Sequence, residues 1–180
     1  MRIRWIIALA MGVAAVAFAS SCASIPKGAT AVKPFDLDNY VGKWFEIARK
    51  DFKWEKNLNN VTAEYSFNDD GSIRVVNRGY DVVKQKWKES VGKAKPVGDL
   101  NEGRLKVSFF GPFYSGYNII EIDPDYQYVL VAGDDLKNLW ILSRKPTIPE
   151  DVKNRYLQIA QEIGYDTSDL VYGSHDRVNE

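Results

Sequence analysis

Cys22 is the residue whose type and position most directly imply a chemical modification. It is the only cysteine in the sequence, and it follows a basic start, an uncharged run over residues 5–18 and the small residues 19–21. A basic segment, an apolar segment and small residues before a cleavage point are typical of a secretory signal peptide. A cysteine directly after that point is the pattern in which the thiol of a bacterial lipoprotein is diacylated. We therefore predict a lipoprotein signal peptide over residues 1–21 and a lipid anchor on Cys22.

Two other interpretations of this N-terminus remain open. Ala19 stands where lipoprotein signals usually carry leucine, so the segment could be an ordinary signal peptide followed by a chance cysteine. It could also be an uncleaved helical anchor, although the apolar run is shorter than the roughly 20 residues that cross a hydrocarbon core of about 30 Å. Ala23 follows Cys22, and because inner-membrane retention usually depends on aspartate at that position, alanine favours sorting to the outer membrane.

The histidine, serine and acidic residues of the sequence do not form a recognisable catalytic pattern. The single histidine, His175, lies in a polar tail over residues 174–180, where no serine of the β-prone segments would orient it as a base. No cysteine follows Cys22, and no group of histidine, cysteine and acidic residues has the spacing of a metal site. We expect no enzymatic activity, no metal and no cofactor.

Composition limits the class of partner. Cleavage before Cys22 leaves residues 22–180, a length typical of one domain, and this domain would fold without disulfide bonds. The whole sequence has 24 basic and 24 acidic side chains, and cleavage removes two arginines, so the mature chain is slightly negative. This balance gives no electrostatic reason to expect a nucleic-acid partner.

The elements that must position these residues form an antiparallel β-meander. Residues 22–34 are small and interrupted by prolines, which is typical of a tether. Short β-prone runs then alternate with turn signals about every ten residues. These runs cover residues 43–50, 60–68, 73–81, 87–94, 104–110, 117–122, 127–132 and 138–144. A meander of eight strands either stacks as a sandwich or closes as a barrel.

One helix is predicted after the last strand. Residues 147–150 have the pattern of a capping box, and Gly164 is well placed to end the helix. An apolar stripe at helical spacing consists of Val152, Tyr156, Ile159 and Ile163. A short strand over residues 170–172 follows. Because the runs at 117–122 and 127–132 are apolar on both faces, we expect the helix to cover the outer wall of the sheet.

Three motifs resemble those of the lipocalin family. The motifs cover residues 39–49, 123–126 and 140–144. The first contains Gly-x-Trp at the start of the first strand, the second lies at the turn between the sixth and seventh strands, and the third ends the eighth strand. Their order along an eight-strand meander makes the resemblance specific, and it extends over about residues 35–173. Residues 107–114 and the leader most resemble those of the bacterial outer-membrane lipocalins.

The resemblance implies an all-β fold. We expect an eight-stranded antiparallel up-and-down β-barrel over residues 35–145, with one C-terminal α-helix packed on its outside and a short final strand within residues 146–173. Gly42 would let the backbone turn tightly into the first strand, and Trp44 would plug the closed end of the barrel. Arg144 could lay its guanidinium group across that indole, a contact worth about 0.5–2 kcal/mol.

The same resemblance implies which side chains line the interior. A barrel of eight strands has room for one small ligand. The residues expected to face a ligand are Glu46, Ala48, Ala63, Tyr65, Val75, Asn77, Ser90, Gly92, Leu105, Val107, Phe109, Tyr117, Ile119, Tyr128, Leu130, Trp140 and Leu142. The small residues among them, such as Ala63 and Gly92, would leave space that a solid core would fill. An apolar tube suits an acyl chain, because each CH₂ removed from water contributes about 0.8 kcal/mol.

Charged residues in or near this tube have two interpretations. Glu46 points inward by the strand period, either as the structural partner of a tyrosine or a basic side chain near the closed end, or as an anchor for a ligand hydroxyl or amine. Lys50, Arg78 and Lys93 lie near strand ends, where they could meet a phosphate or carboxylate head group at the open end.

The sequence thus predicts a lipid-binding protein of the cell outer membrane, held by the acyl chains on Cys22, with its barrel facing the periplasm. We expect it to bind fatty acids or lysophospholipids for transport or storage in cell-envelope maintenance. The alternative is a structural or adhesive envelope lipoprotein with a solid core and no specific ligand. A homodimer is an alternative to a monomer.

Overall fold

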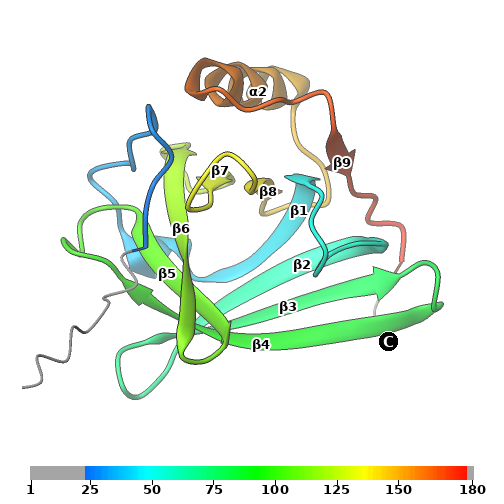
Figure 1. Ribbon diagram of the computed structural model, residues 1–180, viewed down its shortest axis with the longest axis horizontal. Coiled ribbons are helices and arrows are strands. Elements are labelled where there is room, and N and C mark those ends of the chain that lie inside the picture. The colour runs from blue at the N-terminus through cyan, green and yellow to red at the C-terminus, as the bar shows by residue number, and fades with distance from the viewer. Residues whose placement is uncertain (1–22, 178–180) are drawn as a thin grey trace, which may run out of the picture.

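A computed structural model describes residues 23–177 (Figure 1), and the predicted signal peptide, Cys22 and residues 178–180 lie outside that range. The strands curl into a barrel, and one helix lies across its outer wall. The elements are α1 (Leu37–Tyr40), β1 (Gly42–Lys50), β2 (Leu58–Phe67), β3 (Ile73–Asp81), β4 (Lys86–Pro96), β5 (Arg104–Phe110), β6 (Phe113–Ile122), β7 (Tyr128–Ala132), β8 (Leu139–Ser143), α2 (Glu150–Ile163) and β9 (Leu170–Tyr172).

Strands β1 to β8 form one antiparallel sheet that closes on itself. β1 closes it, because β1 pairs with β2 on one side and with β8 on the other. β9 pairs with the last residues of β1 on the edge opposite β8, beyond the residues of β1 that pair with β2. The prediction of an eight-stranded up-and-down barrel is confirmed. β6 begins at Phe113, earlier than predicted, and the short helix α1 was not predicted.

The connections between strands alternate between the two ends of the barrel. We call one end the open end, and its connections are residues 51–57, 82–85, 111–112 and 133–138. The closed end carries α1 and the connections 68–72, 97–103 and 123–127. This division follows from the up-and-down order, in which each strand runs in the opposite direction to the one before it.

Two apolar cores share the barrel wall. The inner core lies inside the barrel and contains Trp44, Tyr65 and Ile119. The outer core lies between the wall and α2, where Tyr156 and Ala160 are buried. The helix therefore covers the outer wall, as the apolar stripe predicted. The predicted capping box is wrong, because α2 begins after Pro149 and no side chain caps its first turn. Gly164 ends the helix as predicted, with φ +110°.

A β-bulge in β1 reverses the predicted direction of Ala48. Glu46 lies opposite Leu142 of the inner core, but the register with β8 shifts between Glu46 and Ala48. Ala48 therefore belongs to the outer core. Arg49, which lies opposite Trp140, takes the next inward position and is almost completely buried.

The inward residues of β7 also differ from the prediction. Tyr128 and Leu130 pack in the outer core, whereas Val129 and Val131 belong to the inner core. Both faces of β7 are apolar, so alternation alone could not choose between them. The assignments of Ala48, Tyr128 and Leu130 to the interior are therefore wrong.

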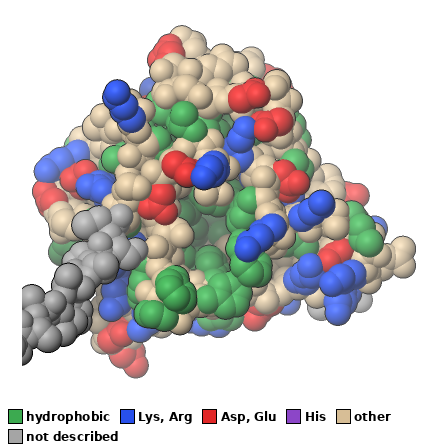
Figure 2. Space-filling view, in the orientation of Figure 1, with side chains coloured by type: hydrophobic (Ala, Val, Ile, Leu, Met, Phe, Trp, Pro, Cys, Tyr) green, Lys and Arg blue, Asp and Glu red, His purple; other side chains and the backbone are tan. Residues whose placement is uncertain are grey.

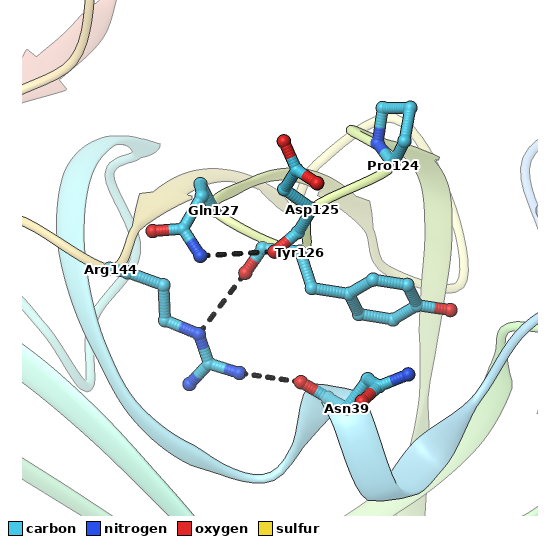
Figure 3. A pocket seen from close by; sticks show the side chains of 6 residues that line it. All are labelled: Asn39, Pro124, Asp125, Tyr126, Gln127 and Arg144. Carbon is cyan, nitrogen blue, oxygen red and sulfur yellow. Dashed lines mark hydrogen bonds between the residues drawn. The ribbon is translucent and has the colours of Figure 1, made fainter.

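Arg144 closes the floor of the barrel through more contacts than the sequence predicted. Its guanidinium carbon lies 3.8 Å from the centroid of the Trp44 ring, which confirms the predicted contact. Nη1 also donates to the carbonyl of Lys43 at 3.0 Å, and Nη2 donates to the carbonyls of residues 39–41 at 2.8–3.0 Å. Nε donates to the carbonyl of Tyr126 at 3.2 Å (Figure 3). One side chain thus satisfies the backbone of the turn that enters β1.

Gly42 has no substitute in this turn. Its φ is +100°, a conformation that other residues adopt with strain. A Cβ atom there would also lie 3.3 Å from Nη1 of Arg144. The indole of Trp44 donates its N–H to the carbonyl of Tyr40 at 2.9 Å, so the ring is fixed by hydrogen bonding as well as by packing.

The segment predicted to be a tether packs against the barrel. The N–H of Ser24 donates to Oδ1 of Asp134 at 2.9 Å, and Nδ2 of Asn118 donates to the carbonyl of Ser24 at 2.9 Å. Further along, the N–H of Val32 donates to the carbonyl of Ile119 at 2.9 Å. Residues 23–34 therefore do not form a free linker.

Substitutions at the floor of the barrel test these contacts. Trp44→Ala opens a large void, and we expect a loss of about 3–5 kcal/mol in the free energy of unfolding. Arg144→Ala loses the ring contact and its charged hydrogen bonds, and we expect a loss of about 3 kcal/mol rather than the 1 kcal/mol of a ring contact alone. Arg144→Lys keeps the charge but not the fork, and should recover less than half of this loss. Urea unfolding measures all three, and an Arg144→Ala loss below about 1 kcal/mol would contradict the assignment.

Candidate functional site

The interior of the barrel is buried near the closed end and accessible near the open end. Along β4 the inward positions are Ala94, which is fully buried, Gly92, which is partly exposed, and Ser90, which is exposed. On β3, opposite these residues, Val75 is buried and Asn77 is partly exposed. Figure 2 shows a hollow near the middle of the molecule with hydrophobic side chains on its wall. The barrel is therefore a cup with one opening.

Most residues that the sequence assigned to the lining lie on the inner face. They are Glu46, Ala63, Tyr65, Val75, Asn77, Ser90, Gly92, Leu105, Val107, Phe109, Tyr117, Ile119, Trp140 and Leu142. Arg49, Val129 and Val131 are inward residues that the sequence pattern missed. A bulge displaces Arg49, and neither residue of β7 differs enough in polarity from its neighbours to reveal its direction.

Gly92 was expected to leave space for a ligand, but in the structure its lack of a side chain allows close contact between two strands. A Cβ atom at this position would lie 2.8 Å from the carbonyl oxygen of Ser108 and 2.9 Å from the ring of Phe109. Glycine is therefore required for close packing between β4 and β5, and Gly92 leaves no free space for a larger side chain. Ala63, on β2, packs at the edge of the inner core and is only partly buried.

Three tyrosine hydroxyl groups form a chain on the floor of the cup. Tyr65 donates its O–H to Tyr117 Oη at 2.8 Å, and Tyr40 Oη lies 2.6 Å from the same oxygen. Burial is the main cause that raises the pKa of each phenol, so all three stay neutral at physiological pH. Two contacts use two of the three hydroxyl protons, which leaves one donor for another acceptor.

A buried ionic network lies higher in the cup, beneath the open end. Arg49 Nη1 donates to Glu46 Oε1 at 2.6 Å, and Nη2 donates to the backbone carbonyls of Glu55 at 2.9 Å and Leu58 at 3.1 Å. Arg49 Nε and Trp140 Nε1 lie 3.5 Å and 3.4 Å from Oε2 of Glu55, which are long distances for hydrogen bonds. Glu46 thus has the basic structural partner that one interpretation predicted, although this partner lies toward the open end.

One guanidinium group faces the two buried carboxyl groups of Glu46 and Glu55, and Asp51 Oδ1 lies 3.8 Å from its Nη2. Burial raises the pKa of Glu46, while the charge and hydrogen bond of Arg49 oppose that shift. Burial and the neighbouring Glu46 carboxylate raise the pKa of Glu55 well above its usual value, and Arg49 only partly offsets them. Glu55 is therefore the carboxyl that more readily keeps a proton.

Residues 51–57, between β1 and β2, form a lid over the mouth of the cup. The ring of Phe52 meets the ring of Trp140 edge to face, with centroids 5.8 Å apart. The ring of Trp54 packs against Phe110 of the β5–β6 hairpin, with centroids 5.2 Å apart. Because β1–β2 and β5–β6 lie on opposite sides of the barrel, this contact bridges the mouth. The lid is held from below by Arg49 and from above by aromatic packing.

The three basic residues expected at the open end do not gather there. Each forms an ion pair: Lys50 with Asp169 at 2.6 Å, Arg78 with Glu89 at 3.3 Å, and Lys93 with Asp70 at 2.8 Å. Asp70 lies in the closed-end connection 68–72, so the placement of Lys93 at the open end is wrong. Pairing with carboxylates also makes these side chains a poor match for an anionic head group.

Two further features of residues 23–177 bear comparison with the interior of the barrel, a surface depression and the grouping of possible metal ligands. A depression of about 340 Å³ lies at the closed end beside Arg144 (Figure 3), but the guanidinium nitrogens there donate to backbone carbonyls. In residues 23–177 no three or more histidine, cysteine or acidic side chains are grouped to hold a metal ion. None of the helices described in that range is long and apolar enough to cross a membrane.

Comparisons with known proteins agree with this architecture. A family model described as a lipocalin-like domain matches residues 35–175. The chain is 46% identical to the outer membrane lipoprotein Blc of Citrobacter freundii over 96% of this chain and 97% of that protein. It is 47% identical to the outer membrane lipoprotein Blc of Escherichia coli over 86% of this chain and 87% of that protein. The structure of insecticyanin from the tobacco hornworm Manduca sexta matches with a TM-score of 0.68 at 17% identity, over 84% and 87% of the two chains.

The ionic network predicts a pH-dependent effect of Glu55→Gln. Because the pKa of Glu55 is raised on folding, the unfolded chain loses this proton first, and its contribution to stability falls as pH rises above about 4.5. Glutamine stays neutral and keeps an acceptor for Trp140. The melting temperature of the variant relative to the parent should therefore rise between pH 5 and pH 8 by about 2–4 °C, which is about 1 kcal/mol for a domain of this size.

The exposed residue Glu64 provides the matched control for this measurement. Glu64→Gln should give a difference from the parent that changes by less than about 1 °C over the same pH range. A Glu55→Gln difference that stays constant or falls as pH rises would show that Glu55 is ionised and stabilising in the folded protein.

Proposed function

The chain belongs to the lipocalin family, and we propose that it is a lipid-binding lipocalin anchored in the bacterial outer membrane. Members of this family bind ligands and are not enzymes, which agrees with the absence of a catalytic pattern in the sequence. The observation that carries the proposal is the increase in solvent exposure of the inward residues along β4, from fully buried Ala94 to exposed Ser90. This increase is expected of a cup that is open at one end. Its apolar wall matches an acyl chain, whose burial contributes about 0.8 kcal/mol per CH₂.

The polar groups of the cup favour one class of amphiphile. Near the mouth, Arg49 already faces the carboxyl groups of Glu46, Asp51 and Glu55, so a fatty-acid carboxylate there would find no unmatched positive charge. An ammonium head group would instead find carboxyl oxygens as acceptors. We therefore place lysophospholipids with an amine in the head group ahead of free fatty acids as ligands. Their transport or storage would serve maintenance of the cell envelope.

The competing function is a structural or adhesive lipoprotein with a solid core. The partial exposure of inward residues such as Asn77 and Ser90, and the hollow in Figure 2, weigh against that alternative.

The location in the outer membrane is proposed from the relatives and from the N-terminus. The Citrobacter and Escherichia proteins are named outer membrane lipoproteins, and the similarity to the Citrobacter protein covers nearly the whole length of both chains. Cys22 follows a signal-peptide pattern and is the residue that would carry the acyl chains. The barrel would face the periplasm.

Cys22→Ser tests the anchor. Without the acylated thiol, the domain should move from the membrane fraction to the soluble fraction, because the acyl chains on Cys22 are the only covalent lipid attachment that we propose. Fractionation in 1 M salt checks this, since electrostatic contacts are screened within about 3 Å there. A variant that still sediments with membranes under these conditions would refute the lipoprotein assignment.

Ala63→Phe tests the cup. The larger ring should occupy space that the acyl chain needs, so we expect the melting temperature to stay within a few degrees of the parent while binding of a fluorescent lysophospholipid weakens about tenfold, or about 1.4 kcal/mol. A solid core would instead lose about 1–3 kcal/mol of stability through overpacking.

Glu64→Phe is the matched control, because Glu64 adjoins Ala63 in sequence but is exposed on the outer face. This variant should bind lipid as the parent does. If Ala63→Phe melts early and still binds normally, the interior is packed and the binding surface lies elsewhere.

A further inference from the structure

The open end of the barrel carries an unusual concentration of exposed apolar side chains. Six of the ten exposed large hydrophobic residues between positions 23 and 177 lie there. They are Trp54, Val82, Val83, Phe110, Phe113 and Leu136. These six residues lie in or next to all four open-end connections, so they are distributed around the mouth of the barrel. We call this set of six residues the apolar rim. Figure 2 shows hydrophobic side chains gathered beside the hollow, with lysine or arginine side chains next to them.

The three aromatic residues of the apolar rim are each more than half exposed to solvent, although two of them also pack against each other. Trp54 is 61% exposed, Phe110 is 64% exposed and Phe113 is 79% exposed. Trp54 and Phe110 contact each other but leave their outer faces in water. Contiguous exposed apolar side chains with polar neighbours indicate an interaction surface. Tryptophan in particular is favoured at the boundary between water and a lipid bilayer.

Charge separates the two ends of the barrel. The closed-end connections contain six carboxylates and neither lysine nor arginine, and the six are Asp69, Asp70, Asp99, Glu102, Asp123 and Asp125. The open-end connections are balanced, with four lysines (Lys53, Lys56, Lys84 and Lys137) and four acidic residues (Asp51, Glu55, Asp134 and Asp135), of which Glu55 is buried. An anionic phospholipid surface would therefore repel the closed end more than the open end.

The start of the described chain lies within reach of the same end. Ser24 is held by Asp134 of an open-end connection and packs over Gly116, where a Cβ atom would lie 2.5 Å from the carbonyl oxygen of Ser24. Gly116 is three residues from Phe113 along β6, which is about 10 Å of strand. Cys22 is two residues before Ser24, so acyl chains on its thiol and the β5–β6 hairpin can enter one leaflet.

From these observations we infer that the apolar rim is a membrane-docking surface, and that the open end of the barrel faces the phospholipid leaflet that holds the anchor. This inference rests on the proposed lipoprotein function for the position of the leaflet. Docking would place the aromatic side chains of the apolar rim among the lipid head groups and upper acyl carbons, with the lysines at the phosphates. A ligand could then move between leaflet and cup without crossing water.

Thiol accessibility tests this orientation in the full chain. An acylated Cys22 has no free thiol, so a single introduced cysteine is the only site for a polar maleimide. Phe113→Cys probes the apolar rim, and Leu100→Cys is the matched control, because Leu100 is 72% exposed in the closed-end connection 97–103. In opened membranes that contain the anchored protein, we expect the Phe113→Cys variant to react at least tenfold more slowly than the Leu100→Cys variant. Equal rates would overturn the inference.

The same two substitutions in the Cys22→Ser chain identify the source of protection. Without lipid, the two soluble variants should react at rates within about twofold of each other. Protection that persists in lipid-free protein, together with a dimer on gel filtration, would assign the apolar rim to a second copy of the chain and overturn the inference.

Sedimentation of the unlabelled parent separates failure of the anchor from failure of the docking surface. A parent chain that does not sediment with membranes would refute the proposed anchor. Docking is then decided with the soluble chain and vesicles of phosphatidylethanolamine and phosphatidylglycerol. Slower labelling of Phe113→Cys on addition of these vesicles, with Leu100→Cys unchanged, supports the docking surface, and no change overturns it.

Discussion

The contact between Arg144 and Trp44 is the interaction on which the shape of this molecule depends. A barrel needs a floor, and the backbone that enters β1 there has carbonyl groups that no neighbouring strand can pair. One planar guanidinium group meets these carbonyls and covers the indole, a task for which the fork geometry of arginine is suited. Because this end is sealed, a ligand or solvent can reach the interior only from the open end. The polar groups in the cup are therefore arranged by their distance from the open end.

The polar groups inside the barrel are arranged by the cost of removing charge from water. The deepest ones are the neutral hydroxyl groups of Tyr40, Tyr65 and Tyr117, which are joined to each other by two hydrogen bonds. The ionisable ones lie nearer the mouth, where Arg49 joins the barrel wall to the backbone of the lid. A charge is least costly where solvent is close, so this order keeps the cup apolar at depth and polar at its entrance.

Sequence periodicity predicted the strands and the helix, because these depend on local alternation, and the resemblance to lipocalins predicted the floor motif of Gly42, Trp44 and Arg144. Periodicity failed where the backbone departs from regular pairing, as at the bulge that turns Ala48 outward. It also failed on β7, where both faces are apolar and Tyr128 and Leu130 belong to the outer core. The lid and the partners of Arg49 depend on contacts between connections, which no local pattern encodes.

The hydrogen bonds that fasten residues 23–34 to the barrel wall limit how far the barrel could move from a membrane that holds Cys22. A flexible linker would let a tethered domain sample a large volume, and its effective concentration at a surface would fall with linker length. Here the slack between Cys22 and the fold is removed by the bonds of Ser24 and Val32. A barrel attached in this way would work only at the surface that holds it, at high local concentration and in few orientations, and would not reach across the periplasm.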